Sequence, residues 1–158
     1  GFIGGAEVDR FGNLNTHWVE ESGKKIRLPG SGGAADIATL ARRCIIIMNH
    51  EKRRFRPRVH FITSPGYGEG GDWRRMKHIH GGGPSRVITS LGIFSFDPAS
   101  GEMLLSFFHP GVTVEEIRGE TGWPLRVSGD LRETLPPSPE ELGAVRKYDP
   151  KGAWTANG

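Results

Sequence analysis

The sequence has a single cysteine among its 158 residues, which excludes an internal disulfide bond and predicts a reducing compartment, the cytoplasm. Long hydrophobic runs are also missing, since the longest apolar stretch, Cys44–Met48, falls far short of the ~18 residues of a membrane helix. Residues 1–5 have neither the basic nor the apolar region of a signal peptide. The net charge of +3 is small, so it favours anionic ligands without requiring nucleic acid.

Glycine, by contrast, is abundant, with 24 residues of 158, about twice its usual share of ~7%. The glycines cluster between hydrophobic runs, which indicates loops that turn tightly or approach a ligand closely. The apolar runs predict the following strands: Phe2–Val8, Cys44–Met48, Val59–Thr63, Arg86–Ile93 and a hairpin over Phe94–Leu105. Helical spacing predicts helices over residues 34–43, 114–121 and 139–147, the last two capped by Thr113 and Ser138.

The order of these segments predicts the fold class. Over residues 29–48 a loop, a helix and a buried strand of branched residues follow one another, as in α/β proteins. We therefore expect an α/β fold with an open, mostly parallel sheet and flanking helices. The length, near the ~150 residues of an average domain, predicts one domain over residues 1–158.

The segment Pro29–Asp36 carries the strongest functional signal. Gly30, Gly32 and Gly33 lead into a predicted helix, where backbone N–H groups are left exposed at the positive helix end. Such a site suits a phosphate, a carboxylate or a developing oxyanion. The segment is neither a Walker A motif, because no Lys-Ser or Lys-Thr follows, nor a dinucleotide-binding fingerprint, because the glycine spacing differs. The alternative is a loop that only turns the chain into the helix.

Two other segments have two interpretations each. The basic run Lys52, Arg53 and Arg54 suits phosphates or carboxylates, or else forms a solvated surface. Residues 65–83 are rich in glycine and polar side chains and have no periodicity. A loop of this kind gates a functional site or is a mobile surface loop.

The histidines and the cysteine give little sign of a reactive centre. Six histidines, among them the pair His78 and His80, complete no metal-binding pattern, so no metal is expected. His109 precedes Pro-Gly and is expected to form hydrogen bonds within a turn. Cys44 opens a buried strand without a nearby base, so we expect it to be inert.

Six stretches of the chain, taken in order, carry a family resemblance: Gly4–Asn15, Arg27–Asp36, Ile47–Phe55, Phe61–Tyr67, Gly83–Thr89 and His109–Glu116. They closely resemble the β subunits of class I coenzyme A (CoA) transferases, the glutaconate CoA-transferase type in particular. The likeness runs from the first residue almost to Pro150. Together the stretches are far more specific than one glycine loop.

The resemblance implies an enzyme in which an α and a β subunit of related open α/β fold share an active site. It implies CoA transfer from an acyl-CoA to a carboxylic acid through an anhydride and then a glutamyl-CoA thioester. CoA is then a substrate, and the partner is the α subunit, without nucleic acid or membrane. The acid itself is not readable from the sequence.

The family's nucleophilic glutamate lies in a Ser-Glu-Asn-Gly segment that is not present in this sequence. Glu7, Glu20 and Glu51 do not match its context, so the role is carried over to none of them. The resemblance therefore implies that residues 1–158 are the C-terminal portion of a β subunit. The N-terminal portion would hold the glutamate.

The resemblance can be carried over to the glycine loop residue by residue. Gly33 matches the family glycine whose backbone N–H contributes to the oxyanion hole, and Gly32 shapes the turn. Ser31, Gly30 and Asp36 are expected to contribute to substrate or CoA binding. Asp36 also suits the first turn of a helix, where an acid is favourable.

Two alternatives stay open. One is a hydrolase on the same fold that opens the ring of a CoA thioester, since such relatives lack the β-subunit glutamate. The other is a non-catalytic subunit that only packs against an α partner. The loop keeps the form found in transferases, which favours transfer.

Overall fold

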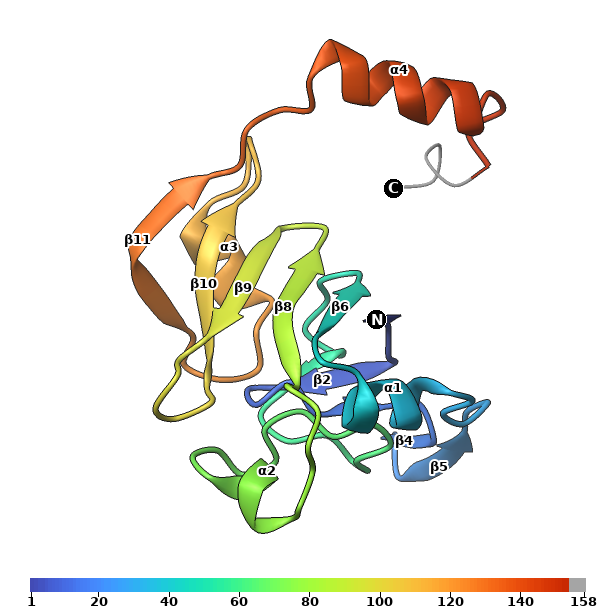
Figure 1. Cartoon of the computed structure of the whole chain (residues 1–158), viewed down its shortest axis with the longest axis vertical. Helices are drawn as coiled ribbons and strands as arrows, with labels where there is room; N and C mark the ends of the chain where they lie inside the picture. The colour runs from blue at the N-terminus through green and yellow to red at the C-terminus, as the bar shows by residue number, and fades with distance from the viewer. Residues whose placement is uncertain (154–158) are drawn as a thin grey trace.

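A mixed β-sheet runs through the body of the molecule (Figure 1). The computed structural model describes residues 1–153. Within them the sheet has six strands in the order β1 (Phe2–Ile3), β6 (Cys44–Met48), β8 (Pro84–Thr89), β9 (Gly92–Phe96), β10 (Met103–Phe108) and β11 (Arg126–Glu133). The pairs β1–β6, β6–β8 and β10–β11 are parallel, while β8–β9 and β9–β10 are antiparallel. The α/β class, the largely parallel sheet and the hairpin of β9 and β10 are confirmed.

Strand β6 illustrates why a run of branched residues forms the centre of this sheet. Its side chains alternate between two faces, and Cys44, Ile46 and Met48 are buried on one of them. Burying one such side chain stabilises the fold by about 1.5–3 kcal/mol. Burial also raises the pKa of the Cys44 thiol, which agrees with the inert packing expected for it.

Two of the four described helices begin at a capping side chain. The described residues contain the following helices: α1 (Ala34–Leu40), α2 (Trp73–Met76), α3 (Val114–Gly119) and α4 (Pro139–Tyr148). Thr113 Oγ1 accepts a hydrogen bond from the Glu116 amide at 3.2 Å, and α4 begins with a complete capping box formed by Ser138 and Glu141. Helix α4 buries none of its side chains and stands apart from the sheet (Figure 1). Among residues 1–153, no helix is both long and apolar enough to span a membrane.

Two small sheets lie beside the large one. One has the order β3 (Leu14–Asn15), β2 (Glu7–Asp9) and β7 (Phe55–Arg56), and the other is a ribbon of β4 (Trp18–Glu21) and β5 (Lys24–Arg27).

The predicted continuous strand Phe2–Val8 is therefore wrong, because β1 joins the large sheet and β2 a small one. The chain passes between the sheets at Gly4 and Gly5. A Cβ at Gly4 would approach the Ile47 carbonyl oxygen to 3.0 Å, so a larger residue at this crossing would require the backbone to shift.

The strand predicted over Val59–Thr63 is also wrong. Here the His60 amide donates to a side chain, Glu7 Oε2, at 3.1 Å rather than to a neighbouring strand. The side chain of Thr63 accepts a hydrogen bond from the Thr16 amide at 2.9 Å. Only its last amide, at Thr63, bonds a strand residue, the Leu14 carbonyl, at 2.8 Å. Apolar residues outside a strand are then left at the surface, with Phe61 44% exposed.

Buried polar side chains hold the β4–β5 ribbon in place. Asn15 is completely buried, and its Nδ2 donates to Glu7 Oε2 at 2.7 Å and to the Trp18 carbonyl at 2.6 Å. Its Oδ1 accepts from the His17 amide at 2.9 Å. The side chain of Asn15 thereby fixes the first residues of β4 to the small sheet.

His50 links the end of β6 to two other segments. Its ring stacks on Phe55 with the centroids 3.8 Å apart, and its nitrogens lie 3.3 Å from Thr89 Oγ1 and 3.1 Å from Thr121 Oγ1. Because the side chain is buried, the pKa of His50 is lowered from 6.5 to about 4. His50 is therefore neutral in the folded protein near neutral pH.

Replacing Asn15 by alanine should lower the free energy of unfolding by about 2–4 kcal/mol, because a buried carboxylate and backbone groups lose their partner. Urea denaturation measures the change. Asn49→Ala, at an exposed asparagine, is the control and should stay within about 0.5 kcal/mol of the unchanged protein. Equal stability of the two variants would contradict the role given to Asn15.

His50 should make the stability depend on pH. Its pKa is lower in the folded chain than in the unfolded chain, so the unfolded chain binds the proton first as the pH falls from about 6.5 to about 4. The free energy of unfolding should fall by up to about 3 kcal/mol over this window, and the full contribution is present above it. Urea denaturation across this pH window should show a smaller decrease in the free energy of unfolding for His50→Gln than for the unchanged protein. An identical decrease in both proteins would contradict the role given to His50.

Candidate active site

The glycine loop, residues 29–33, connects β5 to α1. Gly30 and Gly32 have φ values of +99° and +50°, in the left-handed region that favours glycine. A Cβ built at Gly30, Gly32 or Gly33 meets no atom within 4 Å. The loop is therefore open to a ligand on the side where side chains would otherwise project.

The loop presents backbone donors that the chain itself does not use. Gly32 and Gly33 are exposed, and within residues 1–153 their amides have no hydrogen-bond acceptor. The neighbouring groups are engaged, since the Ala34 amide donates to the Ser31 carbonyl at 2.9 Å and the Gly33 carbonyl accepts from the Ile37 amide at 3.1 Å. Two adjacent free amides beside fixed neighbours can bind an oxygen that carries negative charge.

The other loop residues expected at the site lie close to these amides. Ser31 Oγ donates to the Gly32 carbonyl at 3.2 Å. The carboxylate of Asp36 is in the first turn of α1, exposed, and has no hydrogen-bond partner within residues 1–153. The structure thus brings Gly30, Ser31, Gly32 and Gly33 together, with Asp36 one turn further along.

Hydrogen bonds to the start of β4 anchor the loop. The Gly30 amide donates to the Thr16 carbonyl at 2.8 Å, and the Leu28 amide donates to the His17 carbonyl at 2.9 Å. Because Asn15 fixes this part of β4, the loop is held indirectly by the buried polar side chains of the small sheet.

A cavity of about 370 Å³ lies between the ribbon and the small sheet, lined in part by Leu28, Arg53, Arg54, Glu7 and His60. Glu7 is 2% exposed, and its Oε1 lies 2.6 Å from His60 Nδ1. Sequence reasoning missed this pair, whose members are 53 residues apart in the chain. Both carboxylate oxygens of Glu7 are engaged, which makes it a support of the structure rather than a free nucleophile.

The side chains of the basic run, residues 52–54, lie in two different places. Arg53 and Arg54 both pair with the Glu51 carboxylate, at 2.5 Å and 3.1 Å, and both line the cavity beside Leu28. The side chain of Lys52 is exposed, and its amide donates to Glu120 Oε2 at 2.9 Å. The structure therefore brings Arg53 and Arg54, but not Lys52, to the side of the ribbon that leads to the glycine loop.

The long loop over residues 65–83 is fastened by a buried arginine within α2. Arg74 is 8% exposed, and its guanidinium donates to the carbonyls of Gly66 at 2.8 Å, Gly81 at 2.8 Å and Ala38 at 3.0 Å. Both ends of the loop are thus tied to each other and to α1. Sequence periodicity could not predict α2, because this helix has only four residues.

The remaining candidates lie outside the site. His109 is a hydrogen-bonded turn residue, as expected, since its carbonyl accepts from the Val112 amide at 3.1 Å. Its ring bonds distant residues instead, with Nδ1 2.9 Å from Thr134 Oγ1 and Nε2 3.0 Å from the Thr89 carbonyl. His78 and His80 are exposed on the loop after α2. In the part of the chain that the structure describes, no three His, Cys, Asp or Glu side chains are grouped so that they could hold a metal ion.

Comparison with known proteins relates this chain to enzymes that act on CoA. It is 43% identical over 154 residues to one subunit of the 3-oxoadipate CoA-transferase of Pseudomonas knackmussii, covering 97% of this chain and 59% of that protein. Its structure superposes on the crystal structure of glutaconate CoA-transferase from Acidaminococcus fermentans with a TM-score of 0.88 and 36% identity, covering 98% of this chain and 60% of the other. A further relative, a cholesterol ring-cleaving hydrolase IpdB subunit of Rhodococcus jostii, is 26% identical over 154 residues, which cover 94% of this chain and 59% of that protein.

The chain thus spans about three fifths of the length of the relatives it matches. The sequence model of the family described as coenzyme A transferase matches residues 1–120, which include the glycine loop and most of the large sheet. On this match, and on the identity to the 3-oxoadipate CoA-transferase sequence, the chain belongs to the coenzyme A transferase family.

Proposed function

We propose that this chain is part of an enzyme that transfers CoA between an acyl-CoA and a carboxylic acid, and that it supplies the oxyanion hole. The observation that carries the proposal is the pair of exposed amides at Gly32 and Gly33, which have no acceptor within residues 1–153. In a CoA transferase the oxygen that gains negative charge is the carbonyl oxygen of the thioester. Two preorganised donors stabilise that charge most where it develops, in the transition state.

The reaction proceeds in two parts. A glutamate carboxylate attacks the carbonyl carbon of the acyl-CoA, the C–S bond breaks, and an anhydride forms as CoA leaves as a thiolate. The thiolate then attacks the glutamyl carbonyl carbon of the anhydride, which releases the acyl group as a free carboxylate and leaves a glutamyl-CoA thioester. The acceptor acid reverses these steps. The first attack places negative charge on the carbonyl oxygen of the thioester, which is the charge that the two amides are proposed to bind.

The neighbours of the two amides have supporting roles. Gly30, bonded to the Thr16 carbonyl at 2.8 Å, keeps the loop in position. Ser31 Oγ and the Asp36 carboxylate lie near the amides and can accept hydrogen bonds from the amide groups of the CoA arm. CoA is the substrate that all these groups contact, and no step requires a metal.

The nucleophile and part of the site come from elsewhere. Glu7 is fully engaged by Asn15 and His60, so it is not assigned to the attack, and neither is any other glutamate of this chain. We assign the nucleophile to a portion of the β subunit outside residues 1–158, which themselves form one domain. An α subunit completes the site, in line with a relative that is itself named as one subunit of a CoA-transferase.

A CoA-thioester hydrolase is the second candidate, favoured by the similarity to the ring-cleaving hydrolase subunit. There the amides would stabilise the same oxyanion, but no carboxylic acid would receive the CoA. The higher identity to transferase subunits favours transfer, 43% against 26%. Formation of a new acyl-CoA from an added acid distinguishes transfer from hydrolysis, and neither product would form with a purely structural subunit.

Replacing Gly33 by proline tests the role of its amide directly. The φ of Gly33 is −83°, close to the value that proline imposes, and a Cβ there meets no atom within 4 Å. The substitution therefore removes the N–H at a φ that proline accepts. In the assembled enzyme we expect kcat for CoA transfer to fall by about 10²–10³, the usual effect of losing one oxyanion donor.

Gly33→Ala is the matched control, because it adds a side chain and keeps the N–H. It should retain most of the activity, and both variants should unfold at nearly the same urea concentration. If the proline variant turned over as fast as the alanine variant, the amide would have no part in the reaction.

A further inference from the structure

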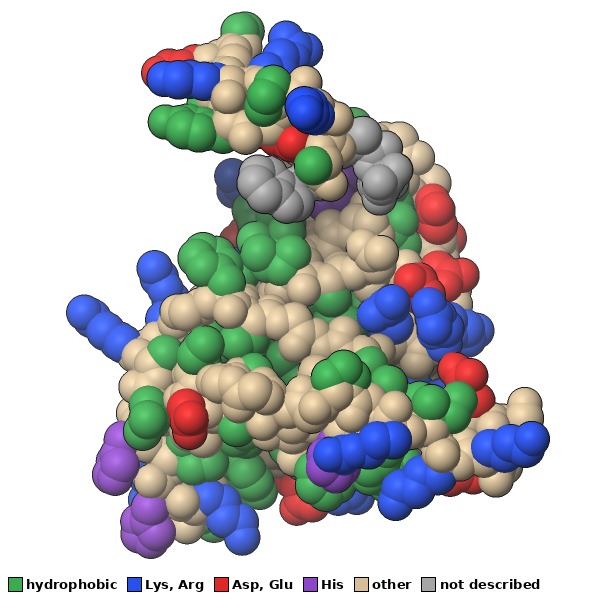
Figure 2. Space-filling view, turned by 90° about the vertical axis from the view of Figure 1, so that its right-hand side faces the viewer, with side chains coloured by type: hydrophobic (Ala, Val, Ile, Leu, Met, Phe, Trp, Pro, Cys, Tyr) green, Lys and Arg blue, Asp and Glu red, His purple; other side chains and the backbone are tan. Residues whose placement is uncertain are grey.

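A groove over the β4–β5 ribbon brings aromatic rings and cations together. It has a volume of about 510 Å³ and is lined by His17, Trp18, Lys25, Arg27 and Phe61. Figure 2 faces this side of the molecule, and Lys, Arg and His side chains gather over its lower part. The volume lies within the ~300–1,000 Å³ of small-molecule sites. The lining contains no aspartate or glutamate.

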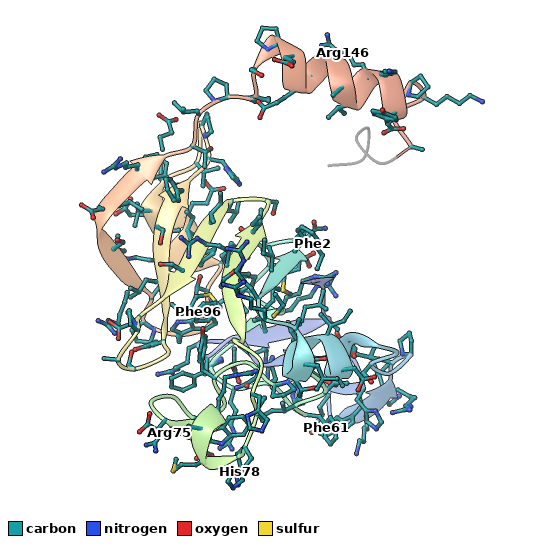
Figure 3. The ribbon with its side chains drawn as sticks, viewed as in Figure 1. Phe2, Phe61, Arg75, His78, Phe96 and Arg146 are labelled. Carbon is teal, nitrogen blue, oxygen red and sulfur yellow. The ribbon has the colours of Figure 1, made fainter. Side chains whose placement is uncertain are left out.

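The aromatic part of the groove is an open stacking surface. Phe61 is 44% exposed and stacks on the His17 ring with the centroids 4.8 Å apart, so its remaining surface is available. It lies below α1, near the ribbon (Figure 3). A flat heteroaromatic base can stack on such a ring, which is worth about 1–3 kcal/mol per base.

The cations of the groove form no ion pair with the described chain, although Glu20 pairs with Lys25 across the ribbon. Within residues 1–153, neither Lys25 nor Arg27 forms an ion pair with a carboxylate. Lys25 Nζ lies 3.9 Å from the centroid of the Trp18 ring. Arg27 Nη1 faces His17 Nδ1 at 2.6 Å, which leaves Nε and Nη2 as a fork of free donors. Such a fork matches the geometry of a phosphate.

The groove lies beside the segment that leads into the glycine loop. The His17 carbonyl accepts a hydrogen bond from the Leu28 amide at 2.9 Å, and Arg27 pairs with Trp18 in the ribbon just before the loop begins. One elongated ligand can therefore reach both places, and CoA is such a ligand, with a thioester at one end and a phosphorylated adenosine at the other.

From these observations we propose that the groove binds the 3′-phosphoadenosine 5′-diphosphate end of CoA. The adenine stacks on Phe61, while Arg27 and Lys25 bind the phosphates. This inference rests on the CoA-dependent function proposed above. It concerns ground-state binding, because the groove contacts a part of CoA that does not react.

The test uses the assembled enzyme and titration calorimetry with 3′-phosphoadenosine 5′-diphosphate, which has no thioester. Arg27→Met and Lys25→Met should each raise the Kd at least tenfold. Lys24→Met is the matched control, since Lys24 is exposed on the opposite face of β5 and does not line the groove. Phe61→Ala should weaken the binding of the nucleotide but not that of 4′-phosphopantetheine, which lacks the base.

Steady-state kinetics separates this proposal from the one on the glycine loop. Groove variants should raise KM for the acyl-CoA at nearly constant kcat, whereas Gly33→Pro lowers kcat. If the nucleotide bound the Arg27, Lys25 and Lys24 variants equally well, the groove would not be its site, whatever the result at Gly33. The two proposals can also fail separately. If the groove variants bound the nucleotide more weakly while Gly33→Pro kept full turnover, the groove would be supported as the nucleotide site and the oxyanion role of Gly33 would be overturned.

Discussion

The hydrogen bond between the buried side chains of Glu7 and Asn15 is the contact on which the position of the glycine loop depends. Asn15 fixes the start of β4, β4 pairs with β5, and the Thr16 carbonyl receives the Gly30 amide. Buried polar groups are costly unless every partner is in place, so this arrangement has few alternatives. The rigidity of an exposed loop thus originates in a small sheet beneath it.

That rigidity determines what the loop can do. Helix α1 has only seven residues, so its dipole adds little, and in the proposed role the charge is bound by the individual amides of Gly32 and Gly33. Such donors help catalysis only when they need not reorganise during the reaction. The anchors at Gly30 and Ala34 provide this fixed geometry on both sides of the two amides. The same ribbon also carries the groove, so one support would position both ends of the CoA molecule proposed to bind here.

The sequence predicted those features that are set by neighbours along the chain. The branched run of β6, the caps Thr113 and Ser138, and the glycines before α1 act locally, and each was recognisable. The split of β1 from β2 and the irregular course of Val59–Thr63 depend instead on distant partners. Glu7 meets His60 across 53 residues, and no periodicity reports such a contact. The groove combines residues 17–18, 25–27 and 61, which only the folded chain brings together.

Infrared spectroscopy can measure whether the Gly33 amide polarises the thioester carbonyl, as proposed above. An acyl-CoA labelled with ¹³C at that carbonyl is bound to the assembled enzyme in which the nucleophilic glutamate is replaced by alanine, so that the thioester is not consumed. Its stretching frequency is then compared between this protein with Gly33 unchanged and the same protein with Gly33→Pro. Hydrogen bonds from the loop should lower the frequency in the unchanged protein and leave it higher in the proline variant. The same frequency in both proteins would show that the Gly33 amide does not polarise the thioester carbonyl.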